Sequence, residues 1–159
     1  MKPGAVDVVT EACLCIKNTA VVLSLRASLW HYEAVELVVR AMRVCCTNVA
    51  VQLAGCAAIQ NLAHDSRCKI IVGEIQGIQC IIKAMARFAD NEAFQRGACG
   101  ALYNMTIPAD ADPDVKLLDG SECVVVVLRS RLFSRSLTHP PPFLPPAPRF
   151  LLKIPLHFV

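Results

Sequence analysis

A block of ten residues that occurs twice, 43 residues apart, constrains the fold of this chain more than any other feature. Residues 52–61 read QLAGCAAIQN, and residues 95–104 read QRGACGALYN. A fainter copy at residues 10–18 stands one further shift of 43 residues toward the N-terminus. A fixed period of roughly 20 to 50 residues is typical of repeat arrays, in which each unit stacks on its neighbours. The sequence therefore predicts an array of similar units.

A second block keeps the same phase. Residues 34–42 (AVELVVRAM) match residues 77–85 (GIQCIIKAM), and residues 120–125 (GSECVV) match them more loosely. The spacing of apolar residues, together with caps at Thr47 or Asn48, at Ser66 and at Asn91, predicts helices over residues 5–20, 24–32, 33–46, 48–64, 66–74, 77–88 and 91–105. One last helix is expected at about residues 120–132. Each full unit then holds one short and two longer helices, and the predicted fold class is all-α.

The helix around Cys56 is rich in small residues. At about 100° per residue, Cys56, Ile59 and Leu62 lie on one side of this helix, and Ala54 lies roughly opposite. Gly55 costs about 1 kcal/mol of helix propensity relative to alanine. We expect close packing against a neighbouring helix to offset that cost.

Composition favours a buried core and excludes two classes of partner. Hydrophobic residues make up 55% of the chain and charged residues 18%. Residues 1–128 carry 11 basic and 13 acidic side chains, so the predicted array has no basic excess and no nucleic acid partner is expected. No uncharged stretch is long enough to span a bilayer and no secretory signal is visible, so no membrane partner is expected either.

The nine cysteines show no disulfide or metal-site spacing. Five fall on the repeat phase, at Cys13, Cys56 and Cys99 in the first block and Cys80 and Cys123 in the second. Cysteines at such positions act as small apolar core residues, which favours a reducing compartment: the cytoplasm, with the nucleus as the alternative. The acidic run at residues 110–114 lacks the glycine and glutamate of a calcium loop. No metal and no cofactor is expected.

The two blocks together resemble the armadillo repeat family. The matching signature is Gln-x-x-Gly/Ala-Cys-x-Ala-Ile/Leu-x-Asn, preceded by Gly-Ile-x-x-Ile-Ile-x-Ala-Met, and it covers roughly residues 5–128. Helical repeats of the HEAT type are the alternative. The resemblance implies a right-handed α-solenoid of three-helix units, with about two full units and one to two partial ones. It also implies a non-catalytic module that binds an extended peptide or another protein in a concave groove lined by the third helices.

The candidate partner-binding residues lie on those third helices. They fall at two adjacent repeat positions, namely Asn18, Asn61 and Asn104 at one and Lys17, Gln60 and Tyr103 at the other. An asparagine amide can donate to and accept from a peptide backbone, and tyrosine is enriched in interface hot spots. The alternatives are asparagines that bond a neighbouring helix and a half-buried core tyrosine. Replacing Asn61 or Asn104 with alanine is expected to weaken partner binding at little cost in stability.

One departure from the family removes one class of expected ligand, the nuclear import signals. Armadillo import receptors carry a tryptophan four residues before this asparagine, where this chain has Leu14, Ala57 and Gly100. Without those aromatic walls, nuclear-signal binding is not expected.

The expected organisation is a repeat region at residues 1–132, in units of about 1–47, 48–90 and 91–132, followed by a Pro-rich basic tail at 133–159. Seven of the ten prolines lie between residues 140 and 155, so the tail is expected to be disordered. An equal alternative is that it is foreign to the array, as from a mis-assigned reading frame.

Apolar residues near both ends of the array, at 8, 9, 21–23 and 124–128, predict self-association or further repeats. Two alternative functions stay open. One is a fragment of a larger armadillo-repeat scaffold or multidomain regulator, and the other is an unrecognised hydrolase.

Overall fold

The computed structural model describes residues 3–106, and every regular element in that range is helical. The elements are α1 (Pro3–Thr19), α2 (Leu23–Leu29), the 3-10 turn η1 (Trp30–Tyr32), α3 (Ala34–Val44), α4 (Val49–Leu62), α5 (Ser66–Glu74), α6 (Gly77–Arg87) and α7 (Glu92–Thr106). The predicted all-α class is confirmed for these residues. The predicted helix at 120–132, the acidic run before it and the tail at 133–159 lie outside the described residues.

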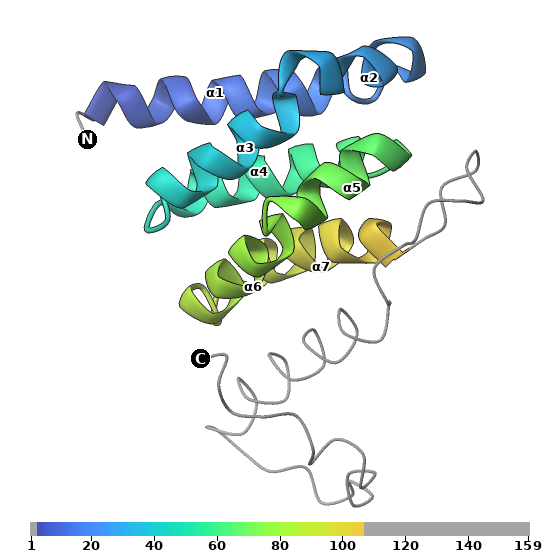
Figure 1. Cartoon of the computed structure of the whole chain (residues 1–159). Coiled ribbons are helices and arrows are strands. Elements are labelled where there is room, and N and C mark those ends of the chain that lie inside the picture. The colour runs from blue at the N-terminus through green and yellow to red at the C-terminus, as the bar shows by residue number, and fades with distance from the viewer. Residues whose placement is uncertain (1–2, 107–159) are drawn as a thin grey trace, which may run out of the picture.

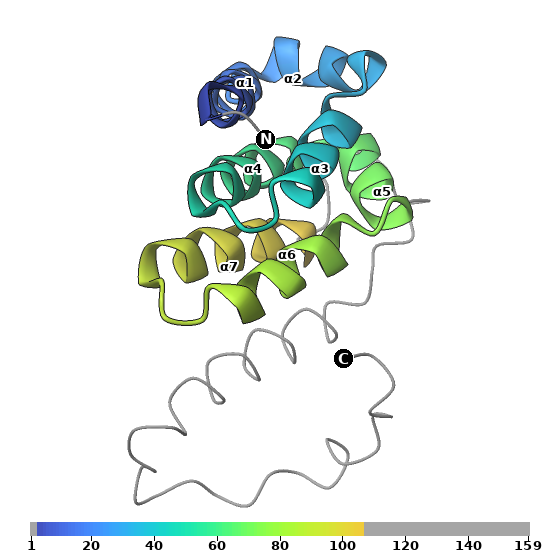
Figure 2. The same cartoon turned by 90° about the vertical axis from the view of Figure 1, so that its left-hand side faces the viewer.

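The helices form two layers (Figures 1 and 2). Helices α1, α4 and α7 lie side by side in one layer, and α4 in the middle contacts both of the others. Helices α2, α3, α5 and α6 form the second layer, in which α3 packs on α4 and α6 packs on α7. A shift of 43 residues carries α1 onto α4 and α4 onto α7, so helices that share a repeat position also share a layer.

Asparagine caps begin two equivalent helices, as predicted. The Asn48 side chain accepts a hydrogen bond from the backbone N–H of Val51 at 3.1 Å, ahead of α4. The Asn91 side chain accepts one from the N–H of Phe94 at 2.9 Å, ahead of α7. Each bond satisfies one of the N–H groups that the first turn of a helix leaves without a partner.

The predicted cap at Ser66 was wrong, because Asp65 holds that position. Asp65 has extended backbone angles, and its carboxylate accepts from the N–H groups of Arg67 and Cys68 at 3.0 and 3.1 Å. Ser66 is already the first residue of α5. The carboxylate also lies where the positive end of the helix dipole favours a negative charge.

The glutamine that opens each repeated block ties two helices together at their turn. Gln52 is 1% exposed, and its Nε2 donates to the carbonyls of Met42 at 2.7 Å and Cys45 at 3.3 Å. Gln95 makes the same pair of bonds to the end of α6, at 2.8 and 2.9 Å. These carbonyls belong to the last turn of the preceding helix and have no partner within it. The recurrence of glutamine in the sequence thus has a structural cause.

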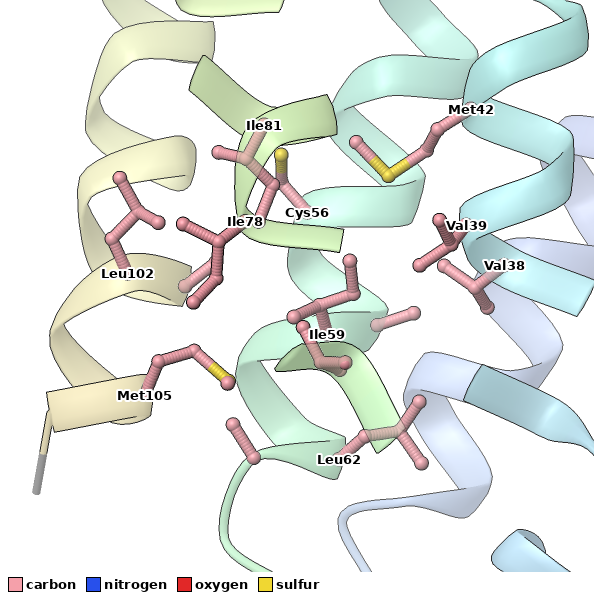
Figure 3. Close-up of a cluster of buried hydrophobic side chains, with 14 of the residues drawn as sticks. Val38, Val39, Met42, Cys56, Ile59, Leu62, Ile78, Ile81, Leu102 and Met105 are labelled. Atoms are coloured by element: carbon pink, nitrogen blue, oxygen red, sulfur yellow. The ribbon is translucent and has the colours of Figure 1, made fainter. Parts of the chain in front are cut away.

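The core runs continuously between the layers (Figure 3). Its labelled residues come from four helices: Val38, Val39, Met42, Cys56, Ile59, Leu62, Ile78, Ile81, Leu102 and Met105. Helix α4 is buried on more than one side. Ala54, which lies roughly opposite Cys56, is 3% exposed, because α4 lies between α1 and α7 and also packs on α3.

Gly55 lies where α4 meets the side chain of Met42 on α3. A Cβ atom at this position would lie 2.5 Å from Cγ and 2.7 Å from Sδ of Met42, which is fully buried. Both distances are well inside van der Waals contact. The expected reason for a glycine in this helix is therefore confirmed.

Two equivalent turns use a left-handed residue that is not glycine. Glu33 has φ 52° before α3, and Gln76 has φ 58° before α6. The left-handed region costs L-residues with a Cβ roughly 1–2 kcal/mol. The repeat therefore preserves the turn geometry itself even though neither unit has the glycine best suited to it.

The predicted exposure of apolar residues near the N-terminal end is largely confirmed. Val8, Val21, Val22 and Leu23 are exposed, whereas Val9 is half-buried. Residues 124–128 lie outside the described range. Within residues 3–106, no helix is both long and apolar enough to cross a membrane.

Candidate partner-binding face

The layer formed by α1, α4 and α7 places the predicted site residues in register. Lys17, Gln60 and Tyr103 stand at the same position on the three neighbouring helices. Tyr103 is 66% exposed, and Lys17 and Gln60 are half-buried. The alternative of a half-buried core tyrosine is therefore wrong for Tyr103. The exposed ring is free to contact a second molecule.

The asparagines bond from each helix to the previous one. Asn61 donates its Nδ2 hydrogen to the carbonyl of Lys17 at 2.9 Å, and Asn104 donates to the carbonyl of Gln60 at 2.8 Å. These bonds tie α4 to α1 and α7 to α4 through the same repeat positions. Asn18 is exposed at the equivalent place on α1.

These bonds give the asparagines a structural role, which was the alternative expectation from the sequence. Asn104 is 8% exposed, so its loss would leave a carbonyl in a largely buried place without its donor. The expectation that Asn61→Ala or Asn104→Ala costs little stability therefore needs correction. The amide oxygen of each asparagine can accept a hydrogen bond in addition to the one that its nitrogen donates.

His64 extends this face at the C-terminal end of α4. Its Nε2 lies 3.3 Å from Nδ2 of Asn104. Since an amide nitrogen only donates, this contact requires an unprotonated Nε2 on His64. Partial burial lowers the pKa of His64, and the charges of Arg26 and Lys69 lower it further. Both effects favour the neutral form of His64, which suits its role as an acceptor.

The repeat pattern gave no signal for His64. The equivalent positions hold Val21 and Ile107, so His64 is not a recurring polar residue. Only the packing of α7 on α4 brings it beside Asn104.

Small residues in the middle of this face leave room for neighbouring side chains. The three helices carry Leu14, Ala57 and Gly100 at the position where import receptors have tryptophan. A Cβ at Gly100 would lie 3.0 Å from Nε2 of Gln60, so the absence of a side chain there makes room for the glutamine. At Gly97 a Cβ would meet only Cδ2 of Leu53, at 3.9 Å. Tyr103 consequently stands beside a surface of small and polar groups.

Burial favours the neutral form of four thiols. Burial is the largest cause that raises the pKa of Cys13, Cys56, Cys68 and Cys80, and the pKa of Cys68 reaches about 12. A nucleophilic or metal-binding cysteine needs the thiolate instead. The eight cysteines among residues 3–106 are all free, and these residues contain no cluster of three or more metal-ligating side chains.

No protein-family model, curated protein or solved structure matches this chain.

Proposed function

We propose that this chain is an armadillo-like α-solenoid whose third helices bind an extended peptide or protein segment. The observation that carries this proposal is the register of Lys17, Gln60 and Tyr103 across α1, α4 and α7. Neighbouring helices of this kind lie roughly 8–10 Å apart. An extended chain spans about 3.3 Å per residue, so one helix is met by every third residue or so of a bound peptide.

The chemistry of the face suits a peptide with both apolar and polar groups. The exposed ring of Tyr103 offers apolar area with a polar tip, and such side chains are common anchors. The amide oxygen of Asn61 can accept a backbone N–H from a bound segment while its nitrogen donates to the carbonyl of Lys17. In this proposal Asn61 has two roles: its nitrogen ties α4 to α1, and its oxygen binds the ligand.

Neutral buried thiols support a non-catalytic role. In this proposal the protein acts by presenting a rigid surface, and no bond is made or broken. The compartment that fits free cysteines is the cytoplasm or the nucleus.

The test is a selection of random displayed peptides against the full chain, followed by affinity measurement on the enriched peptides. Tyr103→Ser should weaken binding by about tenfold or more, the scale of a hot-spot residue. Tyr32→Ser is the matched control, because Tyr32 is 73% exposed but lies in η1, away from the face. Failure to enrich any peptide, or an equal loss in both variants, would refute this site.

A further inference from the structure

The outer side of α1 is an apolar face that its equivalents bury. Val8, Ala12 and Cys15 are exposed and Thr19 is half-buried, and their spacing places them on one side of the helix. A shift of 43 residues gives Val51, Gly55, Ala58 and Leu62 on α4, all of which are buried. A second shift gives Phe94, Ala98, Ala101 and Met105 on α7, also all buried. Val8 is 69% exposed, whereas Val51 and Phe94 are 0% exposed.

The structure shows what covers this face in the other two helices. Gly55 lies against Met42 of α3, and Phe94 packs edge-on against Phe88 at the end of α6, with ring centroids 5.4 Å apart. The covering element is thus the second-layer helix of the same unit. No described helix fills that place against α1 (Figure 2). The face is therefore shaped for a helix like α3 or α6.

The sequence predicts a third segment of this kind, at residues 120–132. Its residues match the inward positions of α3 and α6, with Gly120 at the place of Gly77, Val124 at the place of Ile81 and Leu128 at the place of Met85. Six prolines lie within residues 140–148, in the stretch where the repeat would place the next third helix. Proline breaks a helix interior, so the sequence offers this segment no covering helix of its own.

Charge supports the same pairing. Leu128 corresponds to Met42, which lies against Gly55, and Gly55 corresponds to Ala12. Packing in that register brings the basic residues that follow Leu128, at 129 and 131, toward the N-terminal half of α1. That half carries the exposed acids Asp7 and Glu11. Opposite charges then meet at the rim of an apolar contact, as in ordinary interfaces.

We propose that the face of α1 formed by Val8, Ala12, Cys15 and Thr19 binds residues 120–132 of a second copy of this chain, head to tail. The contact is heterologous, since the two surfaces differ, and it leaves one of each free at the ends of a dimer. Association therefore continues beyond the dimer as the concentration rises. This face is distinct from the partner-binding face of Tyr103 and does not depend on it.

The test is sedimentation of the full chain in reducing buffer across a wide concentration range. The wild-type protein should form species larger than a monomer. Val8→Glu should raise the dissociation constant by more than about tenfold, because it places a charged carboxylate where the contact buries an apolar side chain. Val44→Glu is the matched control, because Val44 is 66% exposed but lies at the end of α3. Equal effects of the two variants would overturn the proposal in favour of general stickiness.

A mixing experiment distinguishes this contact from other modes of association. Leu128→Glu should also remain monomeric alone, whereas an equimolar mixture of the Val8→Glu and Leu128→Glu chains should form a one-to-one dimer and nothing larger. A contact of α1 with α1 would instead survive Leu128→Glu. A segment that folds back on its own α1 would keep the wild-type protein monomeric throughout. Either result would overturn the proposal.

A competitor that needs no variant gives a second measurement. A synthetic peptide of residues 118–134, added in excess to the wild-type chain, should dissociate the assembly, and a scrambled peptide of the same composition should not. Dissociation by neither or by both peptides would contradict the assigned contact.

Discussion

Two glycines on equivalent helices should respond in opposite directions to the same substitution. Gly55 lies in α4 and Gly97 in α7, both in helix interiors. Replacing either with alanine gains about 1 kcal/mol of helix propensity. At Gly97 the new methyl group meets only Leu53 at 3.9 Å, an ordinary contact. Gly97→Ala should therefore raise the free energy of unfolding by up to about 1 kcal/mol.

At Gly55 the same methyl group has no space. It would lie 2.5 and 2.7 Å from two atoms of Met42, in the middle of a side chain that is fully buried. Overpacking of this kind costs about 1–3 kcal/mol, which outweighs the gain in propensity. Gly55→Ala should lower the free energy of unfolding by about 1 kcal/mol, so the two variants should differ by about 2 kcal/mol.

Urea unfolding followed by helical circular dichroism measures both values. In a region of this size, 1 kcal/mol corresponds to about 4–8 °C in Tm, so a thermal scan should separate the variants. Met42→Ala completes a double-mutant cycle, in which the added methyl group fills part of the space that methionine leaves. The two changes should then be less damaging together than the sum of their separate costs. If Gly55→Ala stabilises the protein as much as Gly97→Ala does, the close approach of α3 to α4 is wrong.

Three further outcomes are expected. Glu33→Gly and Gln76→Gly should each stabilise the protein by about 0.5–1 kcal/mol in urea titration, because glycine adopts the left-handed turn without strain; a loss in either would contradict that geometry. Asn104→Ala should lower the free energy of unfolding by about 1–2 kcal/mol, and Asn18→Ala, at an exposed position, by less than about 0.5 kcal/mol. Equal losses would show that the bond between α7 and α4 does not stabilise the fold. Because the pKa of His64 is lowered in the folded state, the folded state binds fewer protons than the unfolded state, so Tm should fall as the pH drops through about 6.5. His64→Gln should weaken this dependence of Tm on pH. An unchanged dependence in the variant would refute the role of His64.

The sequence predicted most of the helices because residues with the same structural role occur at two positions, 43 residues apart. Asn48 recurs as Asn91 and caps a helix at both places, so each copy supports the other. The bounds of α5 were predicted although its cap was not. Asp65 and Ser66 are both good caps, and only the extended backbone of Asp65 decides between them.

The candidate site was harder to predict, because the sequence does not show which polar atoms a neighbouring helix uses. Asn61 and Asn104 have the same helical phase whether they face a ligand or bond a carbonyl on the next helix. Gln52 recurs as Gln95, but each glutamine bonds a carbonyl ten residues earlier, in the preceding helix. The spacing of residues within α4 does not indicate such a bond. The exposure of Tyr103 likewise depends on whether another part of the chain covers this side of α7, which the sequence does not show.

The matching asparagine bonds make the joint between units interchangeable. Asn61 reaches the carbonyl of Lys17 and Asn104 reaches that of Gln60, with an identical sequence separation and lengths of 2.9 and 2.8 Å. A gene segment of 43 codons, duplicated or deleted in frame, therefore restores the same donor and acceptor at the new junction. Such a chain can lengthen or shorten in evolution without inventing a new interface, and each added unit extends the presented surface by one helix.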